Sequence, residues 1–176
     1  MRGMDFSATT AHLVGEAMRE FHARQRHGKS FDTLTPEHQR NIRFDVIEEI
    51  KKNRYDNATG TLVLTDAQVR ALEEVERFWD TEFSRGDRSA GFLEGTVPVA
   101  RDRSHLAKFF FWTAWVATVN RPGQNVSYTN NWPPDPSIGN VPGPDVLLWS
   151  LGGLLALLLV LGLVIYLVHR YRLFYG

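Results

Sequence analysis

Six histidines are the residues of this sequence best suited to bind a metal or move a proton near neutral pH. They stand at positions 12, 22, 27, 38, 105 and 169. A metal site needs several ligands at defined spacings, and these histidines are scattered along the chain. We therefore predict surface or helix-cap roles for them. The acidic groups Glu48-Glu49 and Glu73-Glu74-Glu76 read as exposed faces of amphipathic helices, not as acid–base pairs.

Cysteine is absent, which excludes disulfides, thiolate metal ligands, cysteine nucleophiles and a haem attached through Cys-x-x-Cys-His. The sequence also has no glycine-rich phosphate loop and no nucleophile elbow. We therefore expect no catalytic, cofactor-binding or metal-binding residue in this chain. With 20 Lys and Arg against 20 Asp and Glu in 176 residues, we expect no nucleic-acid partner, since proteins that bind nucleic acid carry a basic surplus.

The apolar spacing predicts a mainly α-helical domain with a short β element. A first helix has Asp5 or Ser7 as its N-cap and ends at Gly28; a second opens at Thr35-Pro36 and buries Ile42, Val46, Ile47 and Ile50. A turn at 56–60 leads into a strand over 61–64. The capping box at 65–68 begins a third helix, whose inward residues are expected to be Val69, Leu72, Val75 and Trp79.

A fourth helix is expected over roughly 104–120, and its segment 109–119 is apolar on nearly all sides. It is too short to span a bilayer. It fits a central core helix, and it also fits a helix packed against membrane subunits or the lipid surface; both can hold at once.

A transmembrane helix is predicted over residues 146–168, which carry no charge and would be roughly 34 Å long as a helix. Pro142 and Pro144 stop it from running back into the preceding segment. Arg170 and Arg172 make the tail over 169–176 basic, so the positive-inside rule places the tail in the cytoplasm and the domain outside. The N-terminus has no apolar signal stretch, which conflicts with that export.

Between the domain (1–119) and the membrane helix, residues 120–145 are rich in Pro, Gly and Asn and predict an extended strap. Its Trp, Tyr and paired Asn residues suggest that it docks on a surface. The predicted docking and structural residues are Trp112, Trp115, Asn120, Arg121, Pro122, Gly123, Tyr128, Asn130, Asn131, Trp132 and Pro133.

Three motifs together resemble the quinol-dependent, single-subunit nitric oxide reductases: Phe109–Trp115, Asn120–Gln124 and Tyr128–Pro134. The upstream segment Tyr55–Leu62 resembles that family too. Pro134-Asp135 departs from it, since the quinol enzymes more often carry His-Glu there. The resemblance implies an extracytoplasmic, haem-less cytochrome c-like domain followed by a membrane helix, in a bacterial or archaeal membrane of a denitrifying respiratory chain.

The resemblance also implies that haem b and non-haem iron lie in a catalytic helix bundle outside this chain, which would receive electrons from quinol. A preceding membrane helix would then explain the export. The chain is expected to be a fragment or split accessory subunit that caps the bundle. The alternative is a single-pass binding or sensor protein. The residues that follow Val168 are too few for the cytoplasmic effector domain that a sensor would need, which counts against this alternative.

Overall fold

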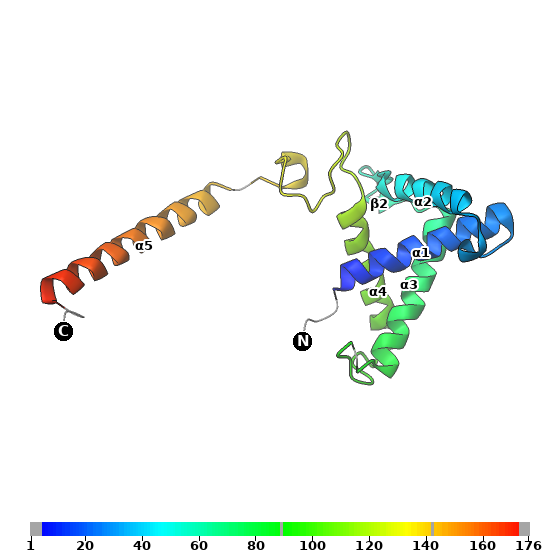
Figure 1. Cartoon of the computed structure of the whole chain (residues 1–176), viewed down its shortest axis with the longest axis horizontal. Coiled ribbons are helices and arrows are strands. Elements are labelled where there is room, and N and C mark those ends of the chain that lie inside the picture. Colours follow the sequence, from blue (N-terminus) through cyan, green and yellow to red (C-terminus); the bar gives the residue numbers. More distant parts are fainter. Residues whose placement is uncertain (1–4, 89, 142, 173–176) are drawn as a thin grey trace. The chain divides into compact units, whose positions relative to one another are not determined.

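The computed structural model describes residues 5–88, 90–141 and 143–172 (Figure 1). The chain divides into two compact units, Met1–Asn130 and Asn131–Gly176, which are described separately. The first unit is the helical domain, and it extends beyond the sequence-based boundary at residue 119 because the segment 120–130 folds onto it.

Local sequence signals set the ends of the first three helices. In α1 (Phe6–His27), the Asp5 carboxylate accepts the Ala8 amide, and Gly28 ends the helix at a φ of 64°. Helix α2 (Pro36–Lys51) begins after Thr35 with proline in its first turn. Helix α3 (Asp66–Arg85) opens with the predicted capping box, in which Thr65 and Gln68 each bind the other's backbone amide.

A short 3-10 turn, η1 (Phe31–Thr33), joins α1 to α2, and an antiparallel hairpin joins α2 to α3. The hairpin pairs β1 (Tyr55–Asp56) with β2 (Thr61–Leu62), so the predicted strand ends two residues early and has a partner that the sequence pattern did not indicate. Helix α4 (Ala100–Thr118) begins four residues before its expected start.

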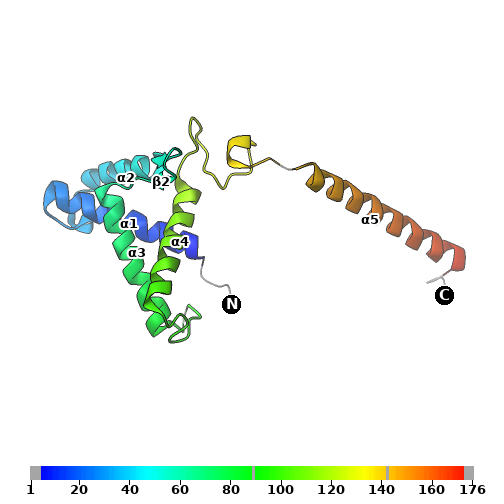
Figure 2. The same cartoon turned by 180° about the vertical axis from the view of Figure 1, so that it is seen from behind.

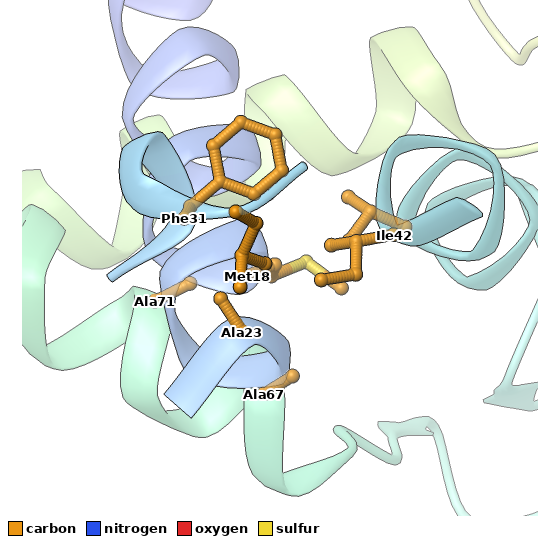
Figure 3. Close-up of a cluster of buried hydrophobic side chains, with 8 residues drawn as sticks. Met18, Ala23, Phe31, Ile42, Ala67 and Ala71 are labelled. Carbon is orange, nitrogen blue, oxygen red and sulfur yellow. The ribbon is translucent and has the colours of Figure 1, made fainter. Parts of the chain in front are cut away.

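The core forms where α1, α3 and α4 cross, with α2 against the far end of α1 (Figures 1 and 2). At that end, Met18 lies between Phe31 and Ile42, and Ala23, Ala67 and Ala71 lie around it (Figure 3). The alanines let α1 and α3 approach closely, which closes this cluster without large side chains from α3.

The other part of the core is aromatic. Trp79 is fully buried and packs against Phe83 and Phe110, with ring centroids 5.5 and 5.0 Å away. Phe6 stacks on Phe110 at 4.7 Å. The Trp79 indole N–H donates to the hydroxyl of Thr10, 3.0 Å away and also fully buried. This hydrogen bond satisfies the two polar groups that the cluster encloses.

Two predicted core residues are exposed. Ile47 and Val69 are 49% and 45% exposed. Each lies about 100° around its helix from a residue that points inward, which is Val46 for Ile47 and Gln68 for Val69. Counting hydrophobic residues missed Ala67, Gln68 and Ala71, which form much of the buried face of α3.

The second unit contains a short 3-10 turn, η2 (Pro136–Ile138), and helix α5 (Pro144–Tyr171). Helix α5 is long and apolar enough to cross a membrane, and Pro144 stands in its first turn as expected. It runs past the predicted end at Val168 into the basic tail. Two parts of the predictions, Pro142 and the tail residues 173–176, lie outside the described residues. The predicted class is confirmed: a mainly α fold with a short β element and one C-terminal candidate membrane helix.

Candidate docking site at the end of helix α4

Beyond α4 the chain makes a tight loop over residues 120–130. Pro122 and Gly123 occupy its tip, where Gly123 has a φ of 71° and the Gln124 amide donates to the Arg121 carbonyl at 3.0 Å. Proline followed by a residue with positive φ is the signature of a type II turn, so this dipeptide reverses the chain. Asn120 then pairs with Ser127 in an antiparallel bridge.

Arg121 organises the loop from inside. Its side chain is 1% exposed, its Nε donates to the Ser127 carbonyl at 3.0 Å, and its terminal nitrogen donates to the Asn130 carbonyl. A buried guanidinium is tolerated when its N–H groups find such acceptors. The Asn130 side chain in turn accepts the Ser127 amide at 3.2 Å. Arg121 therefore supports this domain's own loop.

The loop is fastened to the end of α2 by Asn53. Its side-chain amide donates to the Asn120 carbonyl at 3.1 Å and to the Tyr128 hydroxyl at 2.7 Å. The Asn120 amide donates to the carbonyl of Lys51 at 3.0 Å. Three hydrogen bonds thus join segments that are far apart in the sequence.

Trp115 also joins the loop to the hairpin through ring contacts. Trp115 is 9% exposed and its ring centroid lies 5.8 Å from that of Tyr128 and 6.3 Å from that of Tyr55 in the hairpin. Five of the predicted docking residues are therefore brought together in the domain: Trp115, Asn120, Arg121, Tyr128 and Asn130. Their contacts lie within the domain.

The opposite side of α4 faces solvent in this chain. Phe109 and Trp112 are 54% and 51% exposed, and their rings stack with centroids 6.0 Å apart. The helix predicted to be apolar on nearly all sides therefore has two different faces. One face lies in the core and buries Phe110, Phe111, Ala114 and Trp115, and the other carries the exposed aromatic pair.

The remaining predicted residues, Asn131, Trp132 and Pro133, belong to the second unit. Trp132 is 77% exposed, so its ring is free to contact another molecule. The docking role of these residues and of Trp112 stays a prediction.

His22 differs from the surface or cap role expected of the histidines. His22 is 12% exposed, and its Nε2 lies 2.7 Å from the carboxylate of Glu49, itself 15% exposed, so Glu49 does not lie on an exposed face either. The same carboxylate accepts a hydrogen bond from Thr65, the N-cap of α3. This network ties α1, α2 and α3 together, and the spacing of its members along the chain gave no signal for it.

Among the residues that the structure describes, the side chains do not form a metal centre. His12 lies 3.3 Å from Glu16, four residues on, a helical pair that the sequence reasoning overlooked. Across the described ranges 5–88, 90–141 and 143–172, no three His, Cys, Asp or Glu side chains lie close enough to hold a metal ion.

The family model of the NorB cytochrome c-like domain, which is part of nitric oxide reductase, matches residues 1–134. The chain belongs to this family. The match takes in the helical domain, the 120–130 loop and the exposed Trp132, so it covers all of the predicted docking residues. No curated protein matches the chain.

Membership of the NorB family confirms the nitric oxide reductase relationship that the motifs around α4 and the loop suggested. Together with α5, it indicates a membrane-anchored protein with a nitric oxide reductase domain.

Proposed function

We propose that this chain is a structural portion, a fragment or split accessory subunit, of a quinol-dependent nitric oxide reductase that reduces NO to N2O. The helical domain lies on the extracytoplasmic side, the C-terminus of α5 lies in the cytoplasm, and the domain caps the outer face of a catalytic helix bundle. Haem b and non-haem iron belong to that bundle. Electrons enter the bundle from quinol and do not pass through this domain.

The observation that carries the proposal is the 120–130 loop. The loop is held in one conformation by Arg121, Asn53 and Tyr128, and an exposed tryptophan follows two residues after its end. Exposed tryptophan side chains are enriched at the centres of binding interfaces, and a loop that is already fixed by hydrogen bonds loses little entropy when a partner binds. The lack of cysteine supports a haem-less domain, since c-type haem is attached through Cys-x-x-Cys-His.

Two features support the orientation and the membrane assignment. Helix α5 carries His169 and Arg170 in its last turn, and positive charge marks the cytoplasmic end of a membrane helix. Its Trp149 lies near the other end, where amphipathic rings prefer the membrane interface.

The test is co-purification in detergent with the catalytic polypeptide. A tryptophan at the centre of an interface contributes about 2 kcal/mol or more, so Trp132→Ala should weaken the association about 30-fold. Phe44→Ala is the matched control, because Phe44 is 64% exposed on α2, outside the strap. Equal recovery of the catalytic polypeptide with both variants would contradict the docking role.

A further inference from the structure

One face of α4 carries a line of residues that the described part of the domain leaves exposed or only half-buried. Arg101, His105, Phe109, Trp112 and Val116 follow one another at steps of four, four, three and four residues, which places them along a single side of the helix. The first four are exposed and Val116 is half-buried. We call these five residues the α4 ridge.

The ridge changes character along its length. Its first half is basic, with Arg101 exposed over 78% of its side chain, and Lys108 beside the ridge is 56% exposed. Its second half is the stacked pair Phe109 and Trp112. The cations are only lightly engaged within the domain: the Arg101 guanidinium lies 3.5 Å from Asp102, and the Lys108 amine lies 3.4 Å from Glu76.

We infer that the α4 ridge is a membrane-interface surface, which lays Phe109 and Trp112 among lipid headgroups and turns Arg101 and Lys108 toward lipid phosphates. Tryptophan rings prefer the interface because they combine an apolar body with a polar N–H, and lysine and arginine attract the phosphates. Without such a surface, Phe109 and Trp112 would remain exposed to water on a helix whose other Phe and Trp residues are buried.

The covalent tether favours lipid as the occupant. Residues 131–143 connect the domain to α5 and span at most about 45 Å even when fully extended. The point at which the chain leaves the domain therefore stays within about 45 Å of the start of α5. The aromatic half of the ridge also belongs to the C-terminal half of α4, the end from which the chain continues to the tether.

This inference needs only the membrane anchor, so it stands apart from the proposed role in the reductase. The test uses the full chain in lipid nanodiscs that contain a nickel-chelating lipid. Since the natural chain has no cysteine, a single nitroxide label can be attached at His105→Cys, next to the aromatic pair, and in a second chain at Phe44→Cys on α2. Power saturation then measures how strongly the lipid-borne nickel relaxes each label.

We expect several-fold stronger relaxation at position 105 than at position 44, and loss of that difference when Phe109→Ser and Trp112→Ser are added to the His105→Cys chain. Circular dichroism checks that the combined variant remains folded; if it does not, Phe109→Ser alone replaces it. Equal relaxation at the two positions, or a difference that survives the serine substitutions, overturns the inference. The measurement is repeated in nanodiscs that also hold the catalytic polypeptide. Shielding of the position-105 label there from both the nickel lipid and a water-soluble relaxant also overturns the inference, because protein then covers the ridge, while the reductase role stands.

Discussion

Replacing Arg121 by methionine should open the 120–130 loop. Methionine has a similar length and remains apolar, but it removes the N–H groups that bind the Ser127 and Asn130 carbonyls. A hydrogen bond that involves a charged group contributes about 1.5 kcal/mol or more, so two of them amount to about 3 kcal/mol. The carbonyls can turn to water when the loop opens, so we expect a local effect with little change in the helices.

Amide hydrogen exchange measures this opening. The Arg121 amide donates to the Val126 carbonyl and the Asn130 amide to the Ser127 carbonyl, so both amides are protected only while the loop is closed. A loss of about 3 kcal/mol corresponds to exchange that is roughly 100-fold faster at these amides. Arg101→Met is the control, because Arg101 is an exposed arginine whose nearest acid is the adjacent Asp102.

Unchanged exchange at Arg121→Met would refute this reasoning. The Pro122–Gly123 turn and the Asn53 hydrogen bonds would then hold the loop without the guanidinium. Equal acceleration by Arg101→Met would point instead to a general loss of stability.

Two further predictions concern the domain core. Thr10→Val leaves the buried Trp79 indole N–H without an acceptor and should lower the free energy of unfolding by about 1–3 kcal/mol. Thr10→Ser keeps the hydroxyl acceptor, so it should retain most of the wild-type stability. Denaturant unfolding followed by tryptophan fluorescence checks both variants. Burial, and then the nearby Asp87 carboxylate, raise the pKa of Glu82, whose buried Oε2 has no hydrogen-bond partner among the described residues. The folded state then holds this proton more tightly than the unfolded state, so stability falls as pH rises through the pKa of Glu82. Glu82→Gln should raise the melting temperature at pH 7 and have little effect near pH 4, and an equal effect at both values would contradict this assignment.

The sequence alone was a good guide wherever the cause of a structure is local. Asp5, Thr35 and Thr65 cap the helices that follow them, and Gly28 ends one, because these signals act over a few residues. The predicted burial of residues such as Ile47 was wrong, because spacing indicates an apolar face but does not indicate how much of that face a neighbouring element covers.

The candidate site shows the limit more sharply. Composition marked Tyr128 and Asn130 as unusual for a linker. It could not show that Asn53, 67 and 75 residues before its two partners, would hold them. Contacts at that separation depend on how the helices cross, and the pattern around each residue does not contain that information.

The way the loop is fastened has a mechanical consequence. The tether leaves the domain at Asn130, so a pull transmitted by the anchor arrives at the carbonyl that the Arg121 guanidinium binds. Through the loop, that load passes both to the end of α4 and, by way of Asn120 and the Lys51 carbonyl, to the end of α2. Several bonds must then break together before α4 can be peeled away from its C-terminus. The domain is thereby protected against unravelling by movements of the membrane helix to which it is attached.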